Sequence, residues 1–349
     1  MPSFKPFSLF FSCAAAALFC LSCNGGSDRP DVSGIHVPVQ IVRFDRDLFS
    51  IDTTRTEVAI DGLARKYPHF LPLYFEYLSP INFMVYRAGK SFPAAVRQYY
   101  EYIRPLYDSA QKKFGDLDAV RKGLEDNFRY VRHYYPSYKL PVVVASVESL
   151  NPEEPQEIYG TALYHDTLIL SLQMFLGKDF TQYDPTQYFD YIRRRFEPQY
   201  VVPNSMRAIA LSLYPDSSDE ASMIEQFVEK GKQWWLLDHL EPGVPDSLKT
   251  FFTGDQLEWC KDNEGNIWST ILRNNTDLYT RDKESIQSYL GEAPFTQDMP
   301  HEASPGNIGQ WIGWQIVRKF AATHSSLTLQ QVLATPARKL FQEAAYKPK

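Results

Sequence analysis

The chain has 349 residues, and 36 Lys and Arg residues against 42 Asp and Glu residues give it a net charge of −6 at pH 7. Such a mildly acidic chain has no net electrostatic attraction to nucleic acid or to an anionic membrane surface, so we expect no nucleic-acid partner. Beyond the first 22 residues, no hydrophobic segment approaches the roughly 20 residues that a transmembrane helix needs.

The first 22 residues predict a bacterial lipoprotein signal peptide. Lys5 precedes an apolar run from Phe7 to Cys20, and the small residue Ser22 stands directly before Cys23. The run is too short to span a bilayer comfortably, as in a cleaved leader. Cys20 departs from the usual pattern, which has Leu three residues before the modified cysteine. We expect cleavage before Cys23 and its modification with lipid such as palmitate; the alternative is an ordinary secretory leader.

Cleavage there would leave a mature chain of 327 residues, held at the membrane by lipid on the extracytoplasmic side. Residues 23–38 are small and polar and predict a flexible tether. Residues 39–349 predict a single helix-rich domain. Cys260 is the only cysteine left in the domain, so no intramolecular disulfide can form there. Its apolar neighbours favour a small buried residue over a nucleophile.

The hydrophobic pattern predicts a small β unit between two groups of helices, an α+β fold. The first helical group includes a hairpin, from Ser91 to Val131, that turns at Gly115. A strand is expected near residues 39–44, a buried strand at 140–147 and a β-hairpin at 158–172. The remaining predicted helices are 184–196, beginning at Asp184; 204–213; one from a Ser217–Glu220 capping box to about Leu240; one from a Thr253–Gln256 capping box through Ile271; and 307–324.

The motifs of several enzyme classes are missing from the sequence. The seven histidines are at least 23 residues apart, so the His-Glu-x-x-His motif of zinc peptidases is absent. The expected helix at Met206–Ser212, where such a fold would carry its metal ligands, has neither histidine nor carboxylate. A Gly-x-Ser-x-Gly elbow and phosphate-binding glycine loops are also absent. We therefore assign no catalytic residue, no metal and no cofactor.

Two patterns on helices could carry function. Glu225 and Glu229 lie one turn apart and could act together in glycoside hydrolysis, although a solvated helix face near Lys232 is the preferred alternative. On the last helix, Gly309, Gly313, Trp311 and Trp314 could form a groove in which a partner docks. Packing inside the domain is the alternative that we prefer for this second pattern.

The chain resembles the gliding-motility lipoprotein GldB family of Bacteroidetes over nearly all of its mature length. The resemblance is strongest between residues 171 and 320. It rests on the leader together with Phe44-Asp45-Arg46-Asp47-Leu48-Phe49, Tyr67-Pro68-His69-Phe70, the segments 171–180, 223–242 and 256–268, Ala293-Pro294-Phe295-Thr296 and the segment 304–318.

The resemblance implies a cell-envelope lipoprotein, in the inner or outer membrane, that is associated with gliding motility. The family is distantly similar to predicted zinc-dependent proteases, whose ligand motif this chain lacks. A degenerate zincin-like metallopeptidase fold reused for binding is therefore the preferred expectation, with proteins of the envelope or the motility machinery as partners. The alternative is an envelope hydrolase that acts on peptide or glycan through an unrecognised site.

Overall fold

The computed structural model describes residues 29–86, 89–150, 160–275 and 277–349. The predicted signal peptide, Cys23 and the first part of the predicted tether lie outside the described residues. One compact unit spans Val32–Lys349. Val32 and Val37 are buried in it, although both lie in the stretch predicted as a tether. The ordered unit therefore begins earlier than residue 39, because these valines find apolar neighbours.

A four-stranded mixed sheet forms the β unit, with strand order β1-β2-β4-β3. Strands β1, β2 and β4 are parallel, and β3 is antiparallel to β4 across the turn at His165 and Asp166. The predicted strands and hairpin are confirmed; sequence did not predict the parallel pairing of β2 with β4. The strands are β1 (Ile41–Arg43), β2 (Val142–Ser146), β3 (Thr161–Tyr164) and β4 (Thr167–Ser171).

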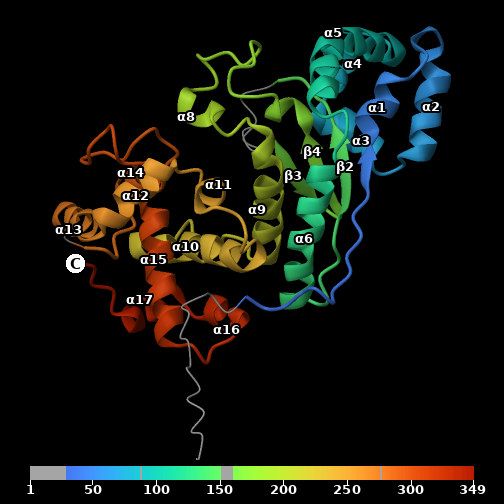
Figure 1. Cartoon of the computed structure of the whole chain (residues 1–349). Helices are drawn as coiled ribbons and strands as arrows, with labels where there is room; N and C mark the ends of the chain where they lie inside the picture. The colour runs from blue at the N-terminus through green and yellow to red at the C-terminus, as the bar shows by residue number, and fades with distance from the viewer. Residues whose placement is uncertain (1–28, 87–88, 151–159, 276) are drawn as a thin grey trace, which may run out of the picture. The chain divides into compact units, whose positions relative to one another are not determined.

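The first helical group precedes β2 and contains the predicted hairpin (Figure 1). Phe44 is fully buried, and the rings of Tyr67, Phe70 and Tyr74 surround it. This group comprises α1 (Phe44–Phe49), η1 (Thr53–Arg55), α2 (Thr56–Lys66), α3 (Phe70–Leu73), the π-helix η2 (Tyr74–Leu78), α4 (Ile81–Tyr86), α5 (Phe92–Lys113) and α6 (Asp118–Tyr134).

The second helical group follows β4, and its helix α9 contacts strands β3 and β4. Helices α10 and α15 cross within this group (Figure 1). The group comprises η3 (Leu172–Phe175), α8 (Asp190–Arg193), η4 (Pro198–Tyr200), α9 (Val201–Leu213), α10 (Met223–Leu240), α11 (Asp246–Thr250), α12 (Gly254–Asp262), α13 (Glu264–Asn274), α14 (Lys283–Leu290), α15 (Ile308–Thr323), α16 (Leu329–Ala334) and α17 (Ala337–Ala344).

The prediction of one helix from Asp184 to Phe196 is wrong. Asp184 accepts a hydrogen bond from the backbone of Thr186, but the helical part is only the four residues of α8. The rings of Tyr183, Tyr188 and Phe196 form a buried cluster instead. Packing of these rings therefore overrides the helical pattern.

Candidate functional site

The four residues predicted as a docking groove lie inside the domain. Trp311 and Trp314 are each 1% exposed. A Cβ atom on Gly309 would lie 2.5 Å from the Phe227 ring, and one on Gly313 would overlap the Phe227 backbone. The groove is therefore filled by α10 of the same chain, which is the internal packing considered above.

The two carboxylates of the predicted pair serve different contacts. Glu225 forms the capping box of α10 with Ser222, and it also accepts a hydrogen bond from Arg338 Nε at 3.0 Å. Glu229 accepts from Lys232 Nζ at 2.9 Å. Glu225 thus stabilises the start of α10, and Glu229 forms an ion pair within the same helix.

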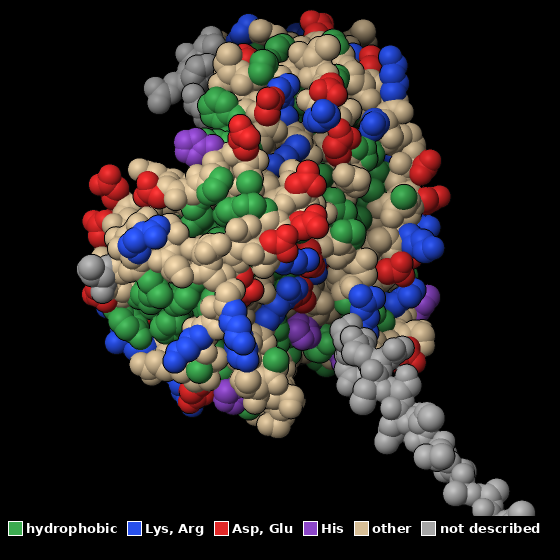
Figure 2. Space-filling view, turned by 60° about the vertical axis from the view of Figure 1, so that its left-hand side comes forward, with side chains coloured by type: hydrophobic (Ala, Val, Ile, Leu, Met, Phe, Trp, Pro, Cys, Tyr) green, Lys and Arg blue, Asp and Glu red, His purple; other side chains and the backbone are tan. Residues whose placement is uncertain are grey.

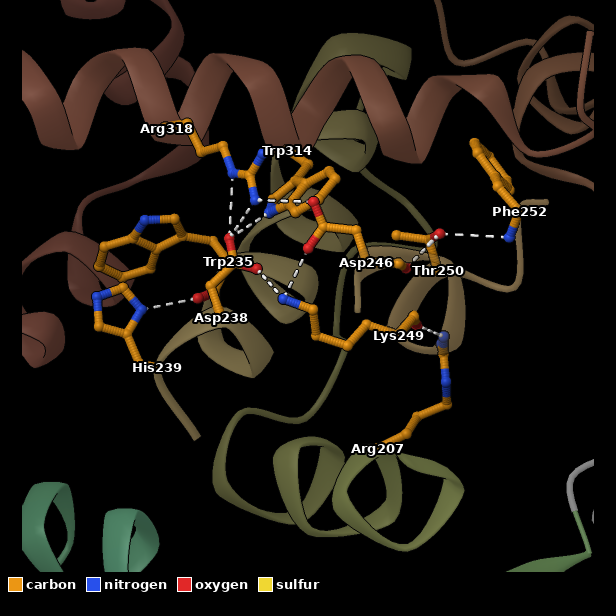
Figure 3. A network of polar contacts seen from close by, with 10 residues as sticks. All are labelled: Arg207, Trp235, Asp238, His239, Asp246, Lys249, Thr250, Phe252, Trp314 and Arg318. Atoms are coloured by element: carbon orange, nitrogen blue, oxygen red, sulfur yellow. Dashed lines mark hydrogen bonds and ion pairs between the residues drawn. The ribbon is translucent and has the colours of Figure 1, made fainter. Parts of the chain in front are cut away.

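A network of polar contacts around Asp238 joins α10 to α11 and α15 (Figure 3). Its Oδ2 atom accepts hydrogen bonds from Trp314 Nε1 at 2.9 Å and from Arg318 Nη2 at 2.9 Å. Its Oδ1 atom accepts from Lys249 Nζ at 2.7 Å, and Lys249 also pairs with Asp246 at 2.9 Å. Charged, partly buried hydrogen bonds of this kind fix the relative position of three helices.

The same network reaches α9 and the chain after α11. Arg207 of α9 donates from Nη2 to the Lys249 carbonyl at 2.6 Å (Figure 3). Burial lowers the pKa of Lys249, but the carboxylates of Asp238 and Asp246 raise it above its ordinary value overall, so the amine stays charged. Phe251 ends α11 in the left-handed conformation (φ 64°), and its ring lies beside the guanidinium group of Arg207.

A polar cavity of about 290 Å³ lies next to this network, and we call it the polar cavity. Helix α9 contributes residues at the spacing of one helical face, and so does α10. The lining residues come from eight segments: Thr161; Arg194 and Arg195; Asn204, Arg207, Ala208 and Leu211; Asp216; Lys230, Gln233 and Trp234; Thr250, Phe251 and Phe252; Leu290, Glu292 and Ala293; Pro305, Gly306, Asn307 and Gln310.

Positive charge exceeds negative charge among the residues that line the polar cavity. Four lining residues are Lys or Arg, and two are Asp or Glu. The guanidinium carbon atoms of Arg195 and Arg207 lie 4.4 and 4.3 Å from the centre of the Phe251 ring. Arg194 donates from Nη2 to the Phe251 carbonyl at 2.7 Å. Phe251 therefore organises three of the four cations.

The two carboxylates of the polar cavity are each paired with a cation. Asp216 binds Lys230 at 2.7 Å, and Glu292 binds Arg195 at 2.7 Å. Burial raises the pKa of both carboxyl groups. The paired cation, Lys230 for Asp216 and Arg195 for Glu292, lowers the pKa by more, so each pKa lies below its ordinary value. Both groups are ionised at neutral pH, so neither can donate a proton, and the lowered pKa makes each a weak proton acceptor.

Several buried polar atoms of the lining have no hydrogen-bond partner among the described residues. They include donors, namely Arg195 Nε and Nη1, Gln233 Nε2 and Trp234 Nε1, and the acceptor Asn307 Oδ1. A buried donor without a partner costs about 1–3 kcal/mol. Ordered water or a bound ligand supplies the missing partner at such places in proteins.

The structure gives no assembled metal site in the part of the chain that it describes, where no three His, Cys, Asp or Glu residues are grouped to hold an ion. Cys260 is buried as expected, and burial raises the pKa of its thiol above the ordinary value. On α9, the residues facing the polar cavity are Asn204, Arg207, Ala208 and Leu211.

Sequence reasoning missed the polar cavity. The run Arg193-Arg194-Arg195 was the available signal, because three adjacent cations are unusual in a chain with a net negative charge. On the face of the molecule in Figure 2, basic and acidic side chains are intermixed, in contrast to the lining of the polar cavity.

Comparison with known protein families identifies a match over nearly the whole chain. The family described as gliding motility protein GldB matches residues 25–348. No curated protein and no solved structure matches the chain significantly. Among the helices that the structure describes, none has the length and apolar character needed to cross a membrane.

Proposed function

Because the chain belongs to the GldB family of gliding-motility proteins, we propose that it is a lipid-anchored envelope protein that supports motility by binding rather than by catalysis. The match covers residues 25–348, so it includes the whole compact unit except its last residue. Its direct partners are proteins of the envelope or of the motility machinery.

The lipid anchor is the first part of this proposal. Its support is the apolar run from Phe7 to Cys20 and the Ser22-Cys23 junction that follows it. The family match begins at residue 25, two residues after the expected lipidated cysteine. A lipid on Cys23 would hold the domain at the membrane without a spanning helix.

The charge balance of the polar cavity is the observation that carries the binding function. Its carboxylates, Asp216 and Glu292, are ionised and paired, and its cations are in excess. General acid–base catalysis needs a group whose pKa lies near the working pH. Cations in excess, fixed by Phe251, instead provide a preformed surface for an anionic group.

A relation to zincin-like peptidases is a further part of the proposal. Helix α9 is the helix at which such a fold would carry its metal ligands, and it lines the polar cavity with Asn204, Arg207 and Ala208. A peptidase cleft that lost its metal ligands and gained arginine and amide groups would account for this lining.

The test is genetic complementation. Deletion of the gene should impair spreading over a surface, or envelope integrity in a host that does not glide, and the wild-type gene should restore it. Variants Glu225→Gln and Glu229→Gln should also restore it, because each amide keeps a hydrogen-bond acceptor. A stably folded, membrane-anchored variant of either kind that fails to complement would favour the envelope hydrolase over the binding protein.

A further inference from the structure

We propose that the polar cavity binds an acidic sugar, that is, a hydroxylated ring that carries a carboxylate or a phosphate group. This inference rests on the proposed binding function and names the class of ligand. Four properties of the lining support it: charge, hydrogen-bonding capacity, a neighbouring aromatic surface and size.

The charge of the lining fits an oxyanion. Arg195 is only 5% exposed, and its Nη2 atom binds Glu292 while its Nε and Nη1 atoms have no partner among the described residues. Arg194 lies beside it and holds the Phe251 carbonyl. A fixed guanidinium group with N–H groups to spare donates charge-assisted hydrogen bonds to carboxylate and phosphate oxygens.

The neutral polar groups fit hydroxyls. Gln233 Nε2 and Trp234 Nε1 are donors without a partner in the described structure, whereas Asn307 Oδ1 is an acceptor without one. A hydroxyl both donates and accepts, so a ring with several hydroxyls can serve both kinds of group. A simple inorganic anion offers at most one or two hydroxyl donors, so it matches this mixture of donors and acceptors less well than a sugar ring does.

An aromatic surface adjoins the polar cavity. The rings of Phe189 and Tyr191 are nearly parallel, with centres 6.1 Å apart and an interplanar angle of 9°. They line an open hollow together with Arg194, which also lines the polar cavity. Phe189 is 54% exposed, so its ring is available to the apolar face of a sugar.

The size of the polar cavity limits the ligand to about one ring. Its volume of about 290 Å³ lies at the lower end of small-molecule sites. One acidic sugar residue would fill it, and a neighbouring residue of a chain would extend over Phe189 and Tyr191. A peptide carboxylate would supply the charge but few hydroxyls, so it fits the lining less well.

The experiment measures binding by calorimetry to the mature lipoprotein in detergent. The probes are glucuronate, glucose 6-phosphate, glucose, inorganic phosphate and a peptide with a free carboxyl end. We expect binding of the two acidic sugars and none of glucose. Variant Arg194→Gln should weaken glucuronate binding about tenfold, because a charge-assisted hydrogen bond is lost. Its matched control, Arg193→Gln, changes a neighbouring arginine outside the lining and should leave binding unchanged.

Each other outcome contradicts the inference. Equal binding of glucose and glucuronate would show that charge is not recognised. Phosphate binding as tightly as the acidic sugars would show an oxyanion site without a sugar site, and binding of the peptide alone would assign the site to a peptide. If Arg194→Gln does not fold, Arg194→Lys tests the same point, because it keeps the charge but removes the planar guanidinium group, and glucuronate binding should still weaken.

Failure of this inference is distinguishable from failure of the proposed function. Binding is measured on the purified protein, whereas the role in motility is measured by deletion and complementation. A deletion phenotype without sugar binding would leave the motility role intact and remove only the ligand class.

Discussion

Gly231 of α10 and Gly313 of α15 face each other where the two helices cross. A Cβ atom on Gly231 would overlap the Gly313 backbone, and a Cβ atom on Gly313 would overlap the backbone of Phe227. The backbones of α10 and α15 are therefore in direct contact, as small residues four apart allow. This contact holds one wall of the polar cavity in place, because both helices line it.

Replacing Gly313 with Ala should destabilise the domain. The added methyl group has no space between α15 and α10, and overpacking of this kind typically costs about 1–3 kcal/mol. Gly62→Ala is the matched control, because Gly62 lies within α2 with open space at its Cβ position. That change should raise the free energy of unfolding by about 0.5–1 kcal/mol. Urea denaturation measures both, and equal effects of the same sign would contradict the close contact.

The side chain of Lys232 should be essential for stability. Its buried Nζ atom donates to Glu229 at 2.9 Å and to the carbonyls of Leu333 and Thr335 at 3.1 and 2.7 Å. Lys232→Met would remove the cation paired with Glu229 and the donor to the Thr335 carbonyl, and should cost about 3–5 kcal/mol.

The matched control for Lys232 is Lys283→Met, which breaks an exposed pair with Glu220. Exposed pairs contribute at most about 1 kcal/mol. If thermal denaturation shows Lys232→Met to be no more harmful than Lys283→Met, the buried amine does not hold α10 to the C-terminal segment.

Glu241→Gln should stabilise the domain at pH 7 and do so less as the pH falls. Glu241 is fully buried, and burial raises the pKa of its carboxyl group well above the ordinary value of 4.5. The charges of Lys249 and Arg207 lower this pKa only in part, and the charge of Asp238 raises it. Above pH 4.5 the unfolded chain loses a proton that the folded chain keeps, so stability falls as the pH rises.

The glutamine variant removes this proton difference. Its gain in free energy of unfolding over the wild type should therefore be present at pH 7 and should shrink below pH 4.5. Urea denaturation at pH 7 and at a pH below 4.5 provides the measurement. A gain that does not vary with pH would contradict the raised pKa.

Cys23 should be the site of lipid attachment. Cells grown with a fatty-acid analogue should label the wild-type protein and not Cys23→Ala, because the acyl chain is joined to this residue. Cys260→Ala is the control and should be labelled like the wild type, since Cys260 is buried in the domain. Equal labelling of Cys23→Ala and wild type would exclude the lipoprotein assignment.

Elements with strong local signals could be predicted from sequence. The capping box of Thr253 and Gln256 is confirmed at the start of α12. The predicted box of Ser217 and Glu220 is wrong, because α10 begins five residues later with Ser222 and Glu225. Both pairs have the same sequence spacing. Which pair starts the helix depends on tertiary contacts: the first backbone N–H groups of α10 donate to the carbonyls of Thr280 and Leu278, which lie far along the chain.

The polar cavity could not be predicted for a related reason. Its arginines are visible in the sequence, but Arg195 pairs with Glu292 and Arg194 binds the carbonyl of Phe251. These partners are separated by 97 and 57 positions. Local periodicity carries no information about contacts at such separation. The Gly309–Gly313 spacing, by contrast, indicated a close helix contact, and only the identity of the second helix was missing.

The central claim is that the protein acts by binding and not by catalysis. The most direct test is complementation with a variant in which the carboxylates of the polar cavity are neutralised. The variant combines Asp216→Asn with Glu292→Gln, which keep hydrogen-bond acceptors for Lys230 and Arg195 but cannot act as acid or base. The rate of surface spreading should return to the wild-type value in a deletion strain that carries this variant. A rate as low as that of the deletion strain, with the variant folded and anchored at normal abundance, would contradict the account and indicate a hydrolase.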